Sequence, residues 1–563
     1  MTRMDDRPEG VEELSMRMST TRTQSGLETQ PTYSPSDLEG FDYGNDLGDP
    51  GQYPFTRGSF PMMYRSRMWT LRNIVGYGAP SDTRAGLKRA FESGSAGIDI
   101  VWDSPSQGGI DPDHPMAVPD VGTDGCSVAC VDHLADLLQD IDVTRTDIAW
   151  HVTATIYPML GALLRRQGKS LADMQGSHMP DYLITNPKGF GERLMPARLA
   201  HRMAVDTLEH VAKHTRKWAC GFPQTYTARQ RGVIAGGELA VGFAIVRKTL
   251  DDLVARGVDI DSVAPRLAWV CPADIDLFED VAKYRALRRM WAKMMVERYG
   301  CTDVRSQRLR VACHTDGRAL TYQRPLNNLM RATVQSLAAI LGGVQSLETC
   351  TYDEAISIPT PEARHLAIAT QQILIHETGV ARVADPLGGS YYVESLTNSV
   401  EAKALELLEE IESRGIIEAI QSGWLEEMCD DINDRVDEEM AAGERIMVGV
   451  NAFQDTDEDV PARFDFDRTS MTQHLADFAD WREKRDIPRL RAALAALKTA
   501  AASDVNIIPA MIDAFDADGT VGEVWGTFRE GSGYTYDPFG VATSPLADAS
   551  LAGVTAPGSE GAS

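Results

Sequence analysis

Arginine and aromatic side chains gather in one loop-rich stretch near the start of the chain, residues 53–113. Guanidinium groups form planar forks that suit phosphate oxygens, whereas flat rings and small residues line extended acyl or nucleotide tails. The alternative is a basic loop whose arginines pair with surface carboxylates of their own domain. The residues that define the stretch are Arg57, Arg65, Arg67 and Arg72, together with Tyr53, Phe55, Phe60, Tyr64 and Trp69.

Apolar runs and helical patterns alternate from about residue 51 to 420. Strands are predicted at 97–102, 147–155, 267–271 and 309–313. Helices are predicted at 131–138, 199–214, 237–256, 278–299 and 326–341. Strands that alternate with helices form parallel sheets, and about eight such units predict a closed (β/α)8 TIM barrel. An open, doubly wound sheet is the alternative, but no glycine-rich fingerprint follows any of these strands.

One segment, GALLRRQGKS at 161–170, has glycines and a lysine in the manner of a phosphate loop. Six residues separate its glycines, whereas the phosphate-loop motif requires four. We interpret the segment as the end of a helix with a glycine cap.

The regions that flank the predicted barrel differ from it in composition. Residues 1–50 are polar and acidic and predict a partly disordered N-terminal arm. Residues 421–530 predict a mainly helical C-terminal extension, with helical patterns at 423–442, 468–501, 506–515 and 521–528. Residues 531–563 are rich in Gly, Ser, Ala and Pro and predict a low-complexity tail.

The composition excludes several classes of function. A formal charge of −27 argues against a general nucleic-acid or anionic-membrane surface. The eight cysteines show no CxxC pair and no metal-ligand spacing, so reduced thiols are expected. No secretory signal pattern and no apolar run of about 18 residues occurs. The sequence therefore predicts a soluble, cytoplasmic protein that binds neither nucleic acid nor membrane.

Several segments closely resemble the large subunit of cobalamin-dependent acyl-CoA mutases, the family of methylmalonyl-, isobutyryl- and 2-hydroxyisobutyryl-CoA mutases. The first block is YPFTRG, MYRSRMWTLRN and VGYG, within residues 53–78. It is followed in order by APRLAWV (264–270), VAKYRALRRMWAKMM (281–295), GGVQSLETCTYDEAISIPT (342–360), DPLGGSYYVESLT (385–397) and VGVNAF (448–453). The resemblance covers residues 51–529, nearly the whole chain.

This resemblance implies a fold, a cofactor and a partner. Family members thread the pantetheine chain of an acyl-CoA along the axis of a (β/α)8 barrel and use adenosylcobalamin for a radical 1,2-rearrangement. Their cobalamin-binding domains carry Asp-x-His-x-x-Gly, whose histidine ligates cobalt, and this sequence contains no such pattern. The resemblance therefore implies a separate small, cobalamin-binding subunit and a dimer of large/small pairs, a heterotetramer. No residue of this chain is expected to ligate a metal.

By the same resemblance, Arg67, Thr70 and Arg72 occupy the positions that hold the phosphates and pantetheine of CoA, with Tyr64 beside them. Ile74 occupies the position that sorts substrates in the family. Tyrosine there accompanies methylmalonyl-CoA, phenylalanine isobutyryl-CoA and isoleucine 2-hydroxyisobutyryl-CoA. Because isoleucine offers bulk but no hydroxyl, a dicarboxylic substrate is disfavoured.

The chain departs from the family around the acyl group. Hydroxyisobutyryl-type enzymes have an aspartate near the substrate hydroxyl, and the matching position here is Val101. Because Val101 offers no acceptor, an unsubstituted branched acyl group fits this position better. The family Ser-Gly-Tyr-His aligns with QTYT at 224–227, so Tyr226 is retained and Thr227 replaces the histidine that bonds the thioester carbonyl. Thr227 can donate a hydrogen bond but cannot carry a charge.

Further departures lie where the family binds the adenosyl group. The family His-x-Gln-Thr segment aligns with residues 312–315, so Ala312 replaces its histidine and His314 replaces its glutamine. His314 is a candidate for the contact with the thioester carbonyl, and the alternative is a structural role. The family His-Thr-Asn is replaced by a segment that begins with Glu348 and ends with Cys350. Glu354 is retained and is the candidate partner of the ribose hydroxyls. The changes indicate altered substrate choice, or lost catalysis, within a retained fold.

The favoured function is adenosylcobalamin-dependent isomerisation of a branched, non-dicarboxylic acyl-CoA such as isobutyryl- or 2-hydroxyisobutyryl-CoA. Two alternatives stay open: a catalytically impaired paralogue that binds acyl-CoA or the small subunit, and a mutase that acts on a carrier-protein thioester. The candidate catalytic residues are Ile74, Tyr226, Thr227 and His314, and Ile74 and Val101 form the predicted acyl pocket.

Overall fold

A computed structural model describes residues 21–151, 155–181, 183, 194–454, 463–464 and 468–547. Backbone contacts divide the chain into two compact units. The first unit comprises residues 1–71, 223–248 and 268–464, and the second comprises 72–222, 249–267 and 465–563. The predicted N-terminal arm and C-terminal tail lie partly outside the described residues.

Within the described residues, nine strands form one sheet in the hydrogen-bonded order β1-β9-β8-β7-β6-β5-β4-β3-β2. The register is parallel in the pairs β2–β3, β3–β4, β4–β5, β5–β6, β7–β8 and β8–β9. The strands are β1 (Thr70–Arg72), β2 (Ile74–Val75), β3 (Ile98–Val101), β4 (Ile148–His151), β5 (Gln175–His178), β6 (Lys217–Gln224), β7 (Leu267–Val270), β8 (Arg310–His314) and β9 (Ser346–Glu348).

The order of the strands shows how the sheet closes. β1 and β2 stand at opposite ends of the order, yet only Asn73 separates them in the chain. The two short strands therefore act as one broken strand, which makes eight, and the prediction of a (β/α)8 barrel with a helical C-terminal region is confirmed.

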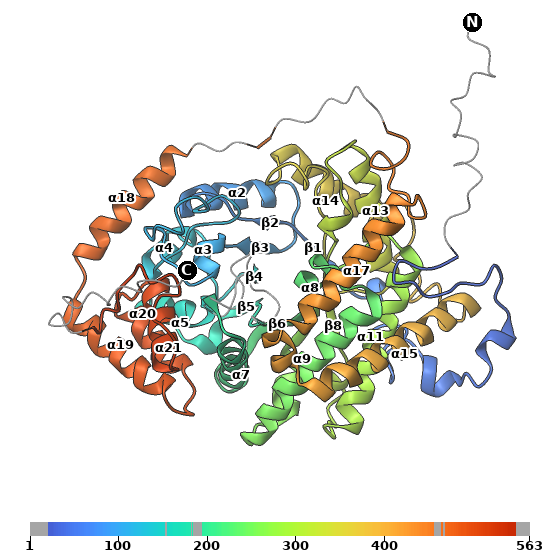
Figure 1. The fold of residues 1–563 in the computed structure, drawn as a ribbon, viewed down its shortest axis with the longest axis horizontal. Helices are drawn as coiled ribbons and strands as arrows, with labels where there is room; N and C mark the ends of the chain where they lie inside the picture. Colours follow the sequence, from blue (N-terminus) through green and yellow to red (C-terminus); the bar gives the residue numbers. More distant parts are fainter. Residues whose placement is uncertain are drawn as a thin grey trace, which may run out of the picture. The chain divides into compact units, whose positions relative to one another are not determined.

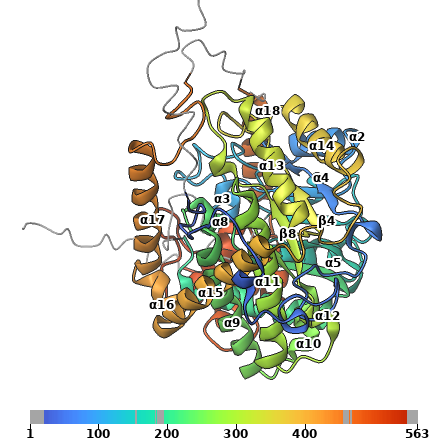
Figure 2. The same ribbon diagram turned by 90° about the vertical axis from the view of Figure 1, so that its right-hand side faces the viewer.

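Long helices follow the strands in the first unit. α11 begins after Asp276, whose side chain caps its first turn. It packs along α15 (Figure 2), and buried ion pairs join Arg285 to Glu394 and Arg289 to Glu401. The helices that lie wholly or partly in this unit are η1 (Pro35–Leu38), η2 (Tyr43–Leu47), η3 (Met63–Arg65), α8 (Tyr226–Gln230), α9 (Ala235–Ala255), α11 (Leu277–Glu297), α12 (Val304–Gln307), η6 (Gly317–Ala319), α13 (Asn327–Leu341), α14 (Pro361–His376), α15 (Tyr391–Arg414), α16 (Ile416–Gln421) and α17 (Trp424–Ala441).

In the second unit, the C-terminal helices pack on helices of the barrel. α20 packs on α5, and α19 packs on both α20 and α21 (Figure 1). The helices of this unit are α2 (Pro80–Glu92), α3 (Ser104–Gln107), α4 (Val131–Leu137), α5 (Ile156–Arg166), η4 (Leu171–Asp173), α7 (Ala197–His214), α10 (Ile260–Val263), η5 (Ala264–Arg266), α18 (Thr469–Glu483), α19 (Ile487–Ala501), α20 (Ile508–Asp516) and α21 (Val521–Gly531).

The glycine cap predicted within 161–170 is present at the end of α5. Gly168 has a φ of +68°, in the left-handed region that glycine adopts at little cost. Its N–H donates to the carbonyl of Arg165 at 3.0 Å, and the N–H of Lys169 donates to that of Leu164 at 2.8 Å. This pair of bonds is a Schellman motif, so the segment ends a helix.

All eight cysteines lie within the described ranges, and each is buried and outside any disulfide. Among the helices that the structure describes, none has both the length and the hydropathy that a bilayer-spanning segment requires.

His178 is a buried, neutral histidine on β5. It accepts a hydrogen bond on Nδ1 from Trp218 Nε1 at 2.8 Å, and its ring stacks on Tyr157 with centroids 5.5 Å apart. Burial lowers the pKa of His178 to about 3. As the pH falls from 7 to 5, the unfolded chain therefore takes up a proton at this position and the folded chain does not. This single group lowers the free energy of unfolding by about 2 kcal/mol over that interval.

The substitution His178→Phe is expected to remove this pH dependence, because phenylalanine does not titrate. Urea unfolding of the wild type and the variant at pH 7 and pH 5 measures it. The loss of stability between the two pH values should be about 2 kcal/mol smaller in the variant. The exposed His376 provides the control, since His376→Phe should leave the wild-type loss unchanged. Equal losses in the wild type and His178→Phe would show that His178 titrates normally.

Candidate functional site

The arginines of the loop-rich stretch do not share one environment. Arg57 Nε lies 3.1 Å from a carboxylate oxygen of Asp385. Arg65 and Arg67 have exposed side chains, and neither forms an ion pair with a residue in the described ranges. Arg67, a predicted CoA contact, is therefore placed where a phosphate can approach it from solvent.

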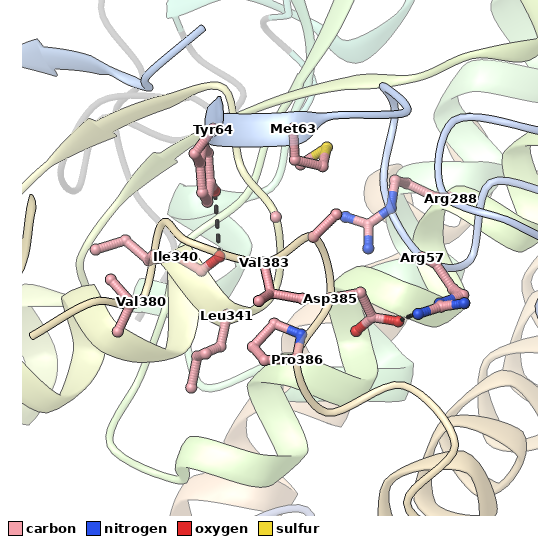
Figure 3. A pocket seen from close by; sticks show the side chains of 12 residues that line it. Arg57, Met63, Tyr64, Arg288, Ile340, Leu341, Val380, Val383, Asp385 and Pro386 are labelled. Atoms are coloured by element: carbon pink, nitrogen blue, oxygen red, sulfur yellow. Dashed lines mark hydrogen bonds and ion pairs between the residues drawn. The ribbon is translucent and has the colours of Figure 1, made fainter. Parts of the chain in front are cut away.

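Tyr64 lines a small pocket in the first unit (Figure 3). Its hydroxyl donates to the carbonyls of Ile340 at 3.1 Å and Val344 at 2.8 Å. Its ring meets Trp69 edge-on, with centroids 4.8 Å apart. Burial raises the pKa of Tyr64 well above its usual range. The hydroxyl thus fixes the loop to the end of α13 and does not project toward a ligand.

Thr70 and Arg72 lie on β1. The backbone N–H of Thr70 donates to the carbonyl of Gln345 at 3.0 Å, and its side chain is half-buried. The Arg72 guanidinium pairs with the buried carboxylate of Asp99, and Asp147 lies 3.9 Å away. A CoA phosphate would therefore compete with Asp99 for Arg72.

The two residues of the predicted acyl pocket lie on adjacent strands of the second unit. Ile74 on β2 is the register partner of Asp99 on β3, and Val101 on β3 is the register partner of His151 on β4. Ile74 and Val101 are both half-buried. Because Asp99 and Val101 are two residues apart on one strand, their side chains lie on the same face of the sheet. The structure therefore places polar side chains beside both apolar ones.

Tyr226 and His314 are brought together in the first unit. Tyr226 opens α8 directly after β6, and His314 is the last residue of β8. Their rings stack, with centroids 4.7 Å apart and planes 13° apart. Thr227 follows Tyr226, and its backbone N–H donates to Gln224 Oε1 at 3.2 Å. Active sites of (β/α)8 enzymes lie at the carboxyl ends of the strands, and these three residues lie there.

Glu354 and Tyr226 converge on a glycine. A Cβ atom added to Gly317 would lie 3.3 Å from Glu354 Oε1 and 3.5 Å from the Tyr226 hydroxyl oxygen. Cys350 Sγ lies 3.4 Å from His314 Nε2. The predicted ribose-binding residue and the candidate catalytic residues of the first unit therefore form one cluster.

A buried ion-pair network holds α8 in position. Arg229, on the turn of α8 that follows Tyr226, pairs with Asp274 and lies 3.1 Å from Asp316. It also donates to Gln24 Oε1 at 3.0 Å. Burial opposes the charge of Arg229, but Asp274 and then Asp316 outweigh it and raise its pKa well above the usual range. The network joins α8 to the loops after β7 and β8.

Two ionisable groups of the cluster, the Cys350 thiol and the Tyr226 hydroxyl, are held protonated. Burial raises the pKa of the Cys350 thiol and that of the Tyr226 hydroxyl well above their usual ranges. Neither group therefore serves as a thiolate or phenolate nucleophile at neutral pH. The arrangement is suited to orienting a polar group of a ligand and to keeping water from it.

The chain matches the profile of the methylmalonyl-CoA mutase family over residues 22–534. It belongs to this family. The 2-hydroxyisobutanoyl-CoA mutase large subunit of Aquincola tertiaricarbonis is 35% identical to it over 514 residues, 89% of this chain and 91% of that relative. The methylmalonyl-CoA mutases of Rhizobium meliloti and Homo sapiens are each 32% identical, over 92% and 89% of this chain and 73% and 67% of their own lengths. The relatives are named as mutases, so the family is one of isomerases.

The sequence does not single out three polar residues that lie beside candidate residues in their own units. Asp99 and His151 lie inside runs that the sequence predicts only as apolar strands. Side chains alternate between the two faces of a strand. Asp99 therefore lies on the same face as Val101, and this spacing could have identified it. Arg229 gave no signal, since an arginine on a short helix is usually solvated.

Proposed function

We propose that this member of the methylmalonyl-CoA mutase family is the acyl-CoA-binding subunit of an adenosylcobalamin-dependent mutase. The observation that carries the proposal is the convergence of Tyr226, His314 and Glu354 at the carboxyl ends of barrel strands. The large-subunit name of one relative supports a separate small partner.

The substrate we propose is a branched, non-dicarboxylic acyl-CoA. Ile74 and Val101 offer hydrocarbon surface to the acyl group. The cation nearest to them in sequence and register, Arg72, is already paired with Asp99 and is therefore poorly placed to bind a substrate carboxylate.

Residues of the first unit are proposed to contact the CoA phosphate, the thioester carbonyl and the ribose hydroxyls. In this proposal Arg67 binds a CoA phosphate, and Thr227 and His314 donate to the thioester carbonyl. The half-buried Glu354 carboxylate can accept from ribose hydroxyls, and Gly317 leaves beside it the space that a Cβ atom would fill. Adenosylcobalamin, held by the partner, supplies the radical chemistry of the 1,2-shift. The chain itself binds, orients and excludes water.

Reconstitution tests the proposal. The purified chain, a cobalamin-binding small subunit of this family, adenosylcobalamin and isobutyryl- or 2-hydroxyisobutyryl-CoA are expected to give the isomerised thioester and an organic-radical signal in electron paramagnetic resonance. Omission of the small subunit is the control and should abolish both. Saturable acyl-CoA binding without product or radical from any C4–C6 acyl-CoA would instead identify a non-catalytic paralogue.

A further inference from the structure

A charged group lies beside the predicted acyl pocket in the second unit. Asp99 is at its centre and is fully buried. One of its carboxylate oxygens pairs with Arg72, and the other lies 3.0 Å from His151 Nε2. The three side chains come from three different strands, β1, β3 and β4.

Strand register places this group against the acyl pocket. Ile74 pairs with Asp99, and Val101 pairs with His151, across neighbouring strands. Directly opposed residues on adjacent strands have neighbouring side chains, as do residues two apart on one strand face. Asp99 and His151 therefore border the two apolar residues that were predicted to contact the acyl group.

The hydrogen bonds of His151 leave one ring nitrogen for a ligand. Burial alone would raise the pKa of Asp99, but Arg72 and then His151 outweigh it, so the carboxylate is ionised. The ionised carboxylate accepts the Nε2 proton of His151, and in the tautomer that this hydrogen bond selects the lone pair lies on Nδ1. No residue in the described ranges bonds Nδ1, and the side chain remains 18% exposed.

We propose that His151, held by Asp99, is a specificity-determining residue that accepts a hydrogen bond from a hydroxyl on the acyl group of the substrate. This inference rests on the proposed function and refines its substrate class. It predicts that a hydroxyacyl-CoA binds more tightly than the same acyl-CoA without the hydroxyl. Val101 supplies no acceptor, and His151, its register partner, takes that role.

Calorimetric binding of 2-hydroxyisobutyryl-CoA, isobutyryl-CoA and free CoA to the full chain tests this inference without turnover. A single well-formed hydrogen bond corresponds to about tenfold in affinity, so the hydroxylated thioester should bind about tenfold more tightly than its partner. His151→Ala should bring the ratio to about one and leave the affinity for free CoA unchanged. The matched control is His376→Ala, an exposed histidine at the end of α14, which should keep the wild-type ratio.

A second variant separates orientation from contact. Asp99→Asn retains the shape of the side chain but no longer fixes the Nε2 proton of His151, and we expect it to lower the ratio while Nδ1 is still present. Equal affinities of the wild type for the two thioesters, with CoA binding intact, would overturn this inference alone. A wild-type ratio that His151→Ala leaves unchanged would do the same. Failure of every CoA thioester to bind would overturn the proposed function as well.

Discussion

Arg229→Met is expected to lower the free energy of unfolding by about 3–5 kcal/mol at pH 8, the cost of leaving buried charges without their partner. Arg229 is 3% exposed, and its partners Asp274 and Asp316 are buried with it. Methionine fills much of the same volume, so the loss reports charge more than packing. Urea unfolding followed by circular dichroism measures it.

The pH dependence of this loss has a defined sign. Without the guanidinium, the pKa values of the buried carboxyl groups of Asp274 and Asp316 rise in the folded variant. When the pKa of a carboxyl group is higher in the folded than in the unfolded chain, the free energy of unfolding is reduced at pH values above that pKa. The reduction becomes smaller as the pH falls and the carboxyl groups take up protons. The loss at pH 8 should therefore exceed the loss at pH 5. Arg305→Met, which breaks an exposed pair with Asp303, is the control and should leave the unfolding midpoint unchanged. An equally small effect of Arg229→Met would show that the network is dispensable.

Arg67→Gln is expected to weaken the binding of CoA and its thioesters by about 10- to 100-fold, the contribution of a charge-assisted hydrogen bond to phosphate. The thermal midpoint should not change, because the side chain is exposed and pairs with no described carboxylate. Calorimetric titration with CoA measures the affinity.

Arg65 provides a matched control for this substitution. It lies two residues away, is also exposed, and carries the same charge. If the phosphate contact is specific to Arg67, Arg65→Gln should weaken CoA binding much less than Arg67→Gln. Equal effects of the two substitutions would indicate a diffuse electrostatic attraction, and no effect of either would remove Arg67 from the CoA site.

Strong periodic signals in the sequence predicted the strands β3, β4, β7 and β8 and the long helices between them. The helix expected over 278–299 is α11 (Leu277–Glu297), and the strand expected over 309–313 is β8 (Arg310–His314). Both segments carry apolar residues at the right period, and capping fixes the start of α11.

Weak strands and one helix break were missed for identifiable reasons. β5 has the sequence QGSH and no apolar run. Gly176 within it has a φ of +121°, and a Cβ atom there would lie 2.3 Å from the carbonyl oxygen of Ile148, so the backbone conformation requires glycine. The helix expected over 468–501 is two helices, because Asp486 caps a new one and Pro488 lies in its first turn.

The site was less predictable than the fold. Resemblance selected Tyr226, His314 and Glu354, which the structure brings together, but spacing in sequence does not show which charged groups pair across strands. The contact of Asp99 with both Arg72 and His151 depends on the register of the sheet. Such long-range pairs emerge only when the barrel closes.

The chain passes between its two units at 71–72, 222–223, 248–249, 267–268 and 464–465. During translation, the residues of the second unit beyond 465, including α19, α20 and α21, leave the ribosome after the whole of the first unit. Helix α5 is synthesised long before α20. The face of α5 that α20 covers therefore remains exposed to water until synthesis is nearly complete. No single cut in the gene releases either unit intact, and a stop codon near position 465 would remove the helices that cover α5.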